Sequence, residues 1–200
     1  MIGILDFGLG NIASISNMYK RMGIKNIICR HENDLNKSNK FILPGVGSFD
    51  NAMQKVKESS FFSILEHKVL KEKSPILGIC LGMQILFKKS EEGQLPGLGW
   101  VDGEVKKIKS SNLILPHMGW NNVKIKNKVK LNSNLTKKTK FYFIHSYVVK
   151  LKNKKYEILE THYGEDFTSS FAFKNFYGVQ FHPEKSHKHG MKILKNFCEI

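Results

Sequence analysis

The 200 residues carry 32 Lys or Arg against 17 Asp or Glu, a formal net charge of +15, yet only Arg21 and Arg30 are arginines. Because specific nucleic-acid recognition relies on the forked guanidinium group, we interpret this charge as a solvated lysine surface and expect no nucleic-acid partner. No apolar run approaches the roughly 20 residues of a membrane span, the first residues lack the features of a signal peptide, and three scattered cysteines exclude a disulfide framework, so we predict one cytoplasmic domain over residues 1–200.

The first half of the chain alternates short apolar runs with helical patterns. Strand patterns cover residues 2–7, 26–30, 41–43 and 76–79. One helical pattern follows the first strand and ends near residue 22, a second covers 50–70 with a break near residue 59, and a third covers 83–88. Strands that alternate with helices indicate a parallel sheet with both faces covered.

The second half is rich in strands and ends in one amphipathic helix. Strand patterns cover residues 104–108, 122–125, 141–149, 156–163, 169–173 and 177–181, and the helical pattern covers 187–197. The whole predicts an α/β fold with a central, mostly parallel sheet, helices on both faces, and antiparallel strands added in the C-terminal half.

The segment GICLG places glycines two positions before and two positions after Cys80. A sharp strand-to-helix turn leaves no room for neighbouring Cβ atoms, and this glycine spacing is typical of turns that hold a nucleophile above a sheet. The N–H groups and dipole at the start of the following helix favour a thiolate. The alternative is a core residue, since cysteine is among the most buried residue types.

The segment FHPEKS follows a predicted strand that Pro183 ends. His182 therefore lies at the end of the strand, and Glu184 can hydrogen-bond the imidazole and fix its tautomer, as in a nucleophile–His–acid triad. The alternative is a surface histidine beside a solvated glutamate. No metal site is expected, because His182, His187 and His189 lack the further ligands of a tetrahedral set.

The segment PGVGSF begins at Pro44, directly after an apolar run. Its glycines allow the backbone to approach a ligand, and such a loop can form half of an oxyanion hole, with the N–H of Leu81 as the other half. The alternative is an ordinary glycine turn at the end of a strand. Singly these segments are weak signals, but in this order they match one known arrangement.

That arrangement resembles the class I, or triad, glutamine amidotransferases, whose fold is flavodoxin-like. More narrowly, the chain is similar to the family of glutaminase subunits of imidazole glycerol phosphate synthase, from histidine biosynthesis. The matching segments span nearly the whole chain in order: DFGLGN, LPGVGSFDNAM, GICLGMQILF, PHMGWN, YFIHSY and GVQFHPEKS. GICLGMQ and FHPE are shared by many triad amidotransferases, whereas PGVGSF, PHMGWN and FHPEKS together are more particular to this subunit.

The resemblance implies that Cys80 attacks the side-chain amide of L-glutamine to form a thioester, with His182 as the proton carrier and Glu184 as its orienting group. No cofactor is implied. Three further sets of residues are carried over by the resemblance: a glutamine-binding set of Gly47, Gln84, Glu92, His145, Ser146 and Tyr147; backbone oxyanion donors at Val46 and Leu81; and a partner interface at Trp120 and Tyr142.

The resemblance also implies a heterodimer with a (β/α)8-barrel cyclase subunit, which receives the ammonia to make imidazole glycerol phosphate and AICAR. We hypothesise that the PGVG loop switches one oxyanion donor in or out, so that ammonia is released only when an acceptor waits. Two alternatives stay open at this point: the same chemistry serving a paralogous synthase that amidates a surface-polysaccharide sugar, and a basic nucleic-acid-binding protein on a degenerate amidotransferase fold. Intact Cys80, His182 and Glu184 count against the second.

Overall fold

The computed structural model describes residues 1–109 and 113–200. Twelve strands are present in this part of the chain: β1 (Ile2–Leu5), β2 (Asn26–Cys29), β3 (Lys40–Gly45), β4 (Ile76–Cys80), β5 (Gly103–Lys107), β6 (His117–Asn122), β7 (Lys124–Ile125), β8 (Lys140–His145), β9 (Tyr147–Leu151), β10 (Glu157–Tyr163), β11 (Glu165–Phe173) and β12 (Phe176–Val179). The helices are α1 (Ile12–Arg21), α2 (Glu32–Asn36), α3 (Phe49–Glu58), α4 (Phe62–Leu70), α5 (Leu81–Gln84) and α6 (His187–Cys198), with short 3₁₀ turns η1 (Lys130–Asn132), η2 (Lys154–Tyr156) and η3 (Pro183–Lys185).

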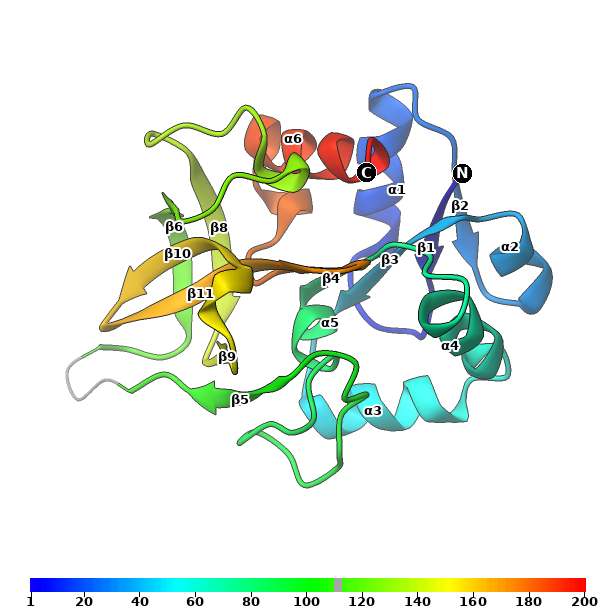
Figure 1. The fold of residues 1–200 in the computed structure, drawn as a ribbon, viewed down its shortest axis with the longest axis horizontal. Helices are drawn as coiled ribbons and strands as arrows, with labels where there is room; N and C mark the ends of the chain where they lie inside the picture. Colours follow the sequence, from blue (N-terminus) through cyan, green and yellow to red (C-terminus); the bar gives the residue numbers. More distant parts are fainter. Residues whose placement is uncertain (110–112) are drawn as a thin grey trace.

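Ten of these strands form one mixed sheet, in the order β2-β1-β3-β4-β12-β11-β10-β7, with β9 paired to β11 and β5 to β9 (Figure 1). The pairs among β2, β1, β3, β4 and β12 are parallel. From β11 onward every pairing is antiparallel. The predicted α/β fold, with antiparallel strands added in the C-terminal half, is therefore confirmed.

The helices cover both faces of the parallel part of the sheet, with α1 and α6 above it and α3, α4 and α5 below it in Figure 1. Alternation along β1 explains this, because successive side chains of a strand point to opposite faces. Leu5 belongs to the apolar cluster that holds Phe49 of α3, whereas Ile4 belongs to the cluster that holds Ile15 of α1 and Ile193 of α6. Two cores, one on each face, therefore hold the sheet rigid.

Helix α1 ends at Arg21, close to the predicted end near residue 22, and both of its ends are stabilised locally. The side chain of Asn11 accepts a hydrogen bond from the backbone N–H of Ser14 at 3.3 Å, which satisfies one of the free donors of the first turn. Lys20 and Arg21 lie in the last turn, where positive charge complements the helix dipole.

The predicted helix over 83–88 is wrong, because α5 ends at Gln84. Residues 85–88 bond instead to a later segment: Leu98 N–H donates to Ile85 O at 2.9 Å, and Val101 N–H donates to Leu86 O at 3.1 Å. The N–H groups of Leu86 and Phe87 donate to carbonyls three residues back, Met83 O at 3.4 Å and Gln84 O at 3.1 Å, so the chain leaves the α-helical ladder after Gln84.

The predicted strand over 141–149 is two strands that belong to different sheets. β8 pairs with β6 in a separate two-stranded sheet, whereas β9 pairs with β5 and β11 in the main sheet. The break falls at Ser146, whose carbonyl accepts the N–H of Ile108 at 3.0 Å. The strand β6 was not predicted, and the pattern over 122–125 divides between the end of β6 and β7.

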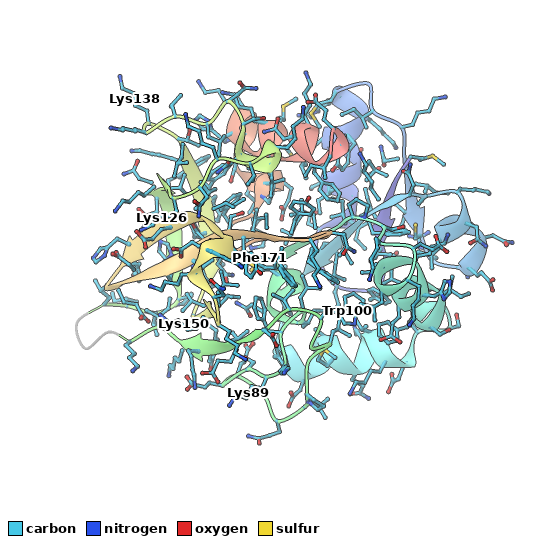
Figure 2. The ribbon with its side chains drawn as sticks, viewed as in Figure 1. Lys89, Trp100, Lys126, Lys138, Lys150 and Phe171 are labelled. Atoms are coloured by element: carbon cyan, nitrogen blue, oxygen red, sulfur yellow. The ribbon has the colours of Figure 1, made fainter. Side chains whose placement is uncertain are left out.

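The lysines lie at the surface, as expected if the positive charge of the chain is solvated. In Figure 2, Lys89 and Lys138 project from the outline of the molecule, while Phe171 lies inside it. Phe171 has no exposed surface, and the Lys89 side chain is 70% exposed beside Glu104.

Candidate active site

Cys80 ends β4 and forms the turn into α5 with φ +54° and ψ −112°, a conformation that L-residues rarely adopt. The turn is held by close backbone packing: a Cβ on Gly82 would lie 1.8 Å from the carbonyl oxygen of Leu43 on β3. A side chain at position 82 would therefore force the turn away from the sheet. The strained turn lifts the sulfur to the carboxyl end of the strand, as GICLG predicts.

Strand register explains how distant segments meet this turn. In the parallel ladders, Ile79 of β4 faces Val179 of β12 on one side, and Cys80 faces Gly45 of β3 on the other. The carboxyl ends of the three strands therefore lie side by side. The PGVG loop leaves β3 beside the sulfur, and the segment from Gln180 leaves β12 on its opposite side.

His182 and Glu184 form a buried ion pair at this edge. The imidazole Nδ1 lies 2.8 Å from Glu184 Oε1, and both side chains are at most 3% exposed. Since a carboxylate only accepts, Nδ1 carries the proton and Nε2 is left as the base. Nε2 makes no hydrogen bond to any described group.

The charge environment of His182 favours its protonated form. Burial lowers the pKa of the imidazole, but interactions with Cys80 and Glu184 outweigh burial and raise that pKa to about 10. The backbone of His182 is also fixed, because its N–H donates to Tyr142 O at 2.9 Å and its carbonyl accepts from Ser186 Oγ at 2.7 Å. The imidazole is thus held in place, and the gain of a proton at its Nε2 is favourable there.

One cavity of about 240 Å³ opens beside the sulfur. The structure brings together around it every residue of the predicted glutamine-binding set and both predicted oxyanion positions, together with Cys80 and His182: Val46, Gly47, Cys80, Leu81, Gln84, Glu92, His145, Ser146, Tyr147 and His182. Ile144 and Lys185 also line it, and sequence reasoning had not singled them out. Glu184 lies behind His182, outside the lining.

Glu92 is the only carboxylate among the lining residues. Its Oε2 accepts the N–H of Phe49, the first residue of α3, at 3.2 Å. Burial raises the pKa of the Glu92 carboxyl, which the Phe49 N–H only partly offsets. A cationic group of a ligand would therefore find in Glu92 a poorly solvated partner of opposite charge.

The two glycines of the PGVG loop differ in their surroundings. A Cβ on Gly45 would lie 2.5 Å from the backbone nitrogen of Gly82, so Gly45 is locked against the turn that carries Cys80. Gly47 has φ +102°, a Cβ there would come no closer than 4.0 Å to Asn51 Nδ2, and Val46 between the two glycines is 47% exposed. The part of the loop that has room to move is therefore Val46–Gly47 alone.

A chain of hydrogen bonds leads from β6 to the cavity wall. Asn121 Nδ2 donates to His117 Nε2 at 3.2 Å, His117 Nδ1 lies 3.0 Å from His145 Nε2, and His145 Nδ1 lies 2.9 Å from Tyr147 O. The amide nitrogen only donates and the carbonyl only accepts, so each ring carries its one proton on Nδ1. Burial lowers the pKa of His117 to about 4, and burial together with the charge of His117 lowers that of His145 to about 3.

The chain continues from the same carbonyl to the sulfur. Gln84 Nε2 donates to Tyr147 O at 3.0 Å and to Gln180 Oε1 at 3.1 Å, and Gln180 Nε2 donates to Cys80 Sγ at 3.6 Å. Sequence reasoning assigned no role to Gln180, His117 or Asn121. The motifs GVQFHPEKS and PHMGWN contain them, and only the fold shows what they touch.

The predicted interface residues lie on an exposed aromatic patch near the site. Trp120 is 48% exposed, stacks on His187 at a centroid distance of 5.5 Å, and packs edge-on against Tyr142 at 6.2 Å. Lys185 Nζ lies 5.6 Å from the centre of the Tyr142 ring, so the patch reaches a residue that lines the cavity.

Within residues 1–109 and 113–200, no three His, Cys, Asp or Glu side chains gather in a way that could hold a metal ion. Among the helices of the same described part, none is long and apolar enough to span a membrane.

Comparison with known proteins agrees with this geometry. The family model described as glutamine amidotransferase class-I matches residues 3–200. The imidazole glycerol phosphate synthase subunit HisH 2 of Methanococcus maripaludis is 50% identical, covering 100% of this chain and 99% of its own, and the HisH subunit of Bdellovibrio bacteriovorus is 48% identical, covering 100% of both.

Solved structures support the fold. A glutamine amidotransferase superposes with a TM-score of 0.76 at 18% identity, covering 99% of this chain and 97% of its own. A putative GMP synthase protein from Thermoplasma acidophilum superposes with a TM-score of 0.75 at 19% identity, covering 99% and 92%. The resemblance stated from sequence is confirmed: the chain belongs to the class I glutamine amidotransferases, among the HisH subunits of imidazole glycerol phosphate synthase.

Proposed function

We propose that this chain is a glutaminase subunit that hydrolyses L-glutamine to glutamate and ammonia. The observation that carries the proposal is the meeting of three separate segments at one cavity: the strained thiol of Cys80, the buried pair of His182 and Glu184, and the glycine loop after β3. A thiol, a base with a fixed tautomer and a loop of backbone donors are the parts that acyl transfer through a thioester requires.

In the first half-reaction, Cys80 Sγ attacks the amide carbon of the glutamine side chain and His182 Nε2 takes the thiol proton. The carbonyl oxygen becomes an oxyanion, which the N–H of Leu81 stabilises together with the N–H of Val46 once the loop turns it inward. When the carbon–nitrogen bond breaks, His182 returns the proton to the leaving nitrogen. Ammonia departs and a γ-glutamyl thioester remains on Cys80.

In the second half-reaction, His182 takes a proton from water, whose oxygen attacks the thioester carbon. The carbon–sulfur bond breaks, the sulfur regains its proton, and glutamate leaves. Glu184 keeps its charge throughout and stabilises the imidazolium that forms in both halves. Burial of this pair strengthens the interaction, because water screens it little.

Substrate orientation follows from the lining of the cavity. We assign Glu92 to the α-ammonium group of glutamine, since it is the lining carboxylate. Gly47, Gln84 and the segment His145–Tyr147 complete the wall around the rest of the substrate. The cavity of about 240 Å³ suits a ligand of this size better than a nucleotide.

The proposal includes a cytoplasmic heterodimer in which residues 1–200 act as one amidotransferase domain. The aromatic patch of Trp120 and Tyr142 binds a (β/α)8-barrel cyclase partner, and ammonia passes through the interface to yield imidazole glycerol phosphate and AICAR. No cofactor or metal takes part in glutamine hydrolysis.

Gating by the PGVG loop remains part of the proposal, now narrowed to Val46–Gly47. Gly47→Ala strains a backbone at φ +102° without a clash. It therefore changes the balance between the orientation in which the Val46 N–H points into the oxyanion hole and the one in which it points away. We expect the ratio of stimulated to basal glutaminase rate to change. An unchanged ratio in Gly47→Ala contradicts the switch. Gly45→Ala tests packing against Gly82 and does not test the switch.

The decisive experiment measures ammonia and glutamate release by the purified chain, alone and with the cyclase partner and its nucleotide substrate. We expect turnover to depend on the partner and to vanish in Cys80→Ala. Cys198→Ala is the matched control, because that thiol bonds to Leu194 O within α6. Turnover retained in Cys80→Ala overturns the mechanism. If glutamine is hydrolysed but the rate does not respond to this cyclase, the glutaminase serves another synthase.

A further inference from the structure

Gln180 lies beside the nucleophile and has no role in the mechanism above. It is the first residue after β12 and is completely buried, and its backbone N–H donates to Ser169 O at 2.9 Å. Its side-chain Nε2 lies 3.6 Å from Cys80 Sγ and its Oε1 lies 3.1 Å from Gln84 Nε2. Side chain and backbone are thus both fixed.

The orientation of the Gln180 amide follows from its neighbours and is not a free choice of flip. Tyr147 O can only accept, so the Gln84 atom that contacts it is the amide nitrogen. That same nitrogen contacts one terminal atom of Gln180, which must then be the acceptor oxygen. The remaining terminal atom of Gln180, the one facing the sulfur, is the N–H donor.

The upstream chain holds this arrangement. Tyr147 O also receives the Nδ1 proton of His145, whose tautomer is fixed by His117 and Asn121. Tyr147 O already accepts from both Gln84 Nε2 and His145 Nδ1, so it does not compete for the Gln180 N–H. The donor therefore points at Sγ before any substrate arrives, at no cost of reorganisation during the reaction.

We propose that Gln180 is a further catalytic residue, whose amide N–H donates a hydrogen bond to Cys80 Sγ and stabilises the thiolate that attacks glutamine. The inference rests on the proposed function, in which Cys80 is the nucleophile. A hydrogen bond to a charged acceptor is stronger than one to a neutral thiol, so the bond favours the thiolate over the thiol. The neutral thiol has a weaker option, donating its own proton to Ile144 O at 3.8 Å.

The test is alkylation of Cys80 by iodoacetamide as a function of pH, followed by peptide mass spectrometry that separates Cys80 from Cys29 and Cys198. Gln180→Met keeps the volume and removes the donor. We expect alkylation at neutral pH to slow by about tenfold, the equivalent of one hydrogen bond to a charged group. The limiting rate at high pH stays at the wild-type value, because there the sulfur is ionised in both proteins.

A second substitution at position 180 and a matched control accompany Gln180→Met. Gln180→Glu keeps the acceptor for Gln84 and sets a carboxylate against the sulfur, so neutral alkylation slows further. Ser169→Ala removes a fully buried hydroxyl that has no hydrogen-bond partner within the described chain and leaves the profile unchanged. The other ionisable groups that face the site stay the same in all variants: His182 with Glu184 behind it, His145, Glu92 and Lys185.

A measurement on the unsubstituted chain guards against misfolded variants. In ¹⁵N-labelled protein, the side-chain amide signal of Gln180 is expected to move when Cys80 is alkylated at neutral pH. A wild-type pH profile in folded Gln180→Met, or an unmoved amide signal, overturns the inference. A Cys80 that stays unreactive at every pH in the wild-type protein instead overturns the proposed function.

Discussion

The N-terminal and C-terminal halves of this chain bury different kinds of side chain. Of the described residues up to 100, the buried polar ones are Ser16, Ser38, Gln84 and Ser90. Beyond residue 100, fifteen are buried: His117, Asn132, Thr139, His145, Glu157, Glu160, Thr161, Thr168, Ser169, Ser170, Asn175, Gln180, His182, Ser186 and Asn196. The N-terminal half is thus an apolar frame around one strained turn, and the C-terminal half is a buried network of donors and acceptors.

This difference assigns separate tasks to the halves. Apolar packing and close backbone approach make the turn at Cys80 rigid, because such contacts do not tolerate added volume. Polar networks fix protonation states and tautomers, because each buried donor requires an acceptor. The proposed nucleophile and oxyanion loop come from the first half, and the proposed base, its carboxylate and the donor to sulfur come from the second. The active site lies at the seam between the two halves of the chain, at the carboxyl ends of β4 and β12.

The largest expected effect is at the seam itself. Glu184→Gln keeps the shape of the side chain but removes the charge that stabilises the imidazolium of His182. Glutamine turnover with the cyclase present should fall by about 10²–10⁴-fold, measured as ammonia release. Glu199→Gln, at an exposed carboxylate beside Lys130, serves as the control. Turnover within twofold of wild type in Glu184→Gln would separate the buried pair from catalysis.

The next effect tests the apolar frame. Gly82→Ala sets a Cβ 1.8 Å from Leu43 O, so the turn must leave β3, and we expect a loss of about 3 kcal/mol or more in the free energy of unfolding. Gly23→Ala is the control, since a Cβ there meets no atom within 4 Å and costs only backbone strain at φ +70°, about 1 kcal/mol. Equal losses in urea denaturation would show that close approach is not what fixes the turn.

The third effect tests the polar network through pH. Because the folded-state pKa values of His145 and His117 are lowered to about 3 and about 4, the unfolded chain binds more protons below pH of about 6.5. Their stabilising contribution is complete above that pH and is lost as pH falls toward 4. Each histidine adds a slope of about 1.4 kcal/mol per pH unit in this window.

Denaturation curves measured between pH 4 and 7 check this slope. His145→Leu should reduce it by one proton, whereas Phe143→Leu, which removes a ring stacked on His117, should lower stability equally at each pH. If the slope of unfolding free energy against pH is the same in His145→Leu as in the wild type, His145 is not buried as a neutral ring. His182 has the opposite sign: with its pKa raised to about 10, its contribution is present below pH of about 6.5 and is lost as pH rises through about 10.

The smallest effect concerns the lysine-rich surface. The pair of Lys88 and Asp102 is 66% and 65% exposed, so Lys88→Met should change the free energy of unfolding by about 0.5 kcal/mol or less. Glu160→Gln should cost more, about 1–3 kcal/mol, because its side chain is 10% exposed and accepts from Lys126 at 3.1 and 3.2 Å. Thermal unfolding of both variants at low and high salt separates the two cases. Equal losses would mean that burial does not set the strength of these pairs.

Local chemistry in the sequence determined the parts that need only neighbouring residues. The glycines around Cys80 and the proline after His182 each act within a few residues, so the turn at Cys80 and the triad candidates could be predicted. The alternation of strand patterns with helical patterns likewise predicted that the sheet of the first half is parallel. The early end of α5 could not be predicted, because residues 85–88 accept hydrogen bonds from residues 97–101, a contact that only the fold creates.

Tertiary structure alone decided which distant polar atoms meet. Gln180 and Cys80 are 100 positions apart, and only the register of β12 against β4 sets the amide beside the sulfur. His117 and His145 meet because β6 pairs with β8, a pairing that no alternation of apolar residues in PHMGWN predicts. A sequence specifies hydrogen-bond partners of this kind only through the whole fold, because a side chain pairs with what the strand register brings within about 3 Å of it.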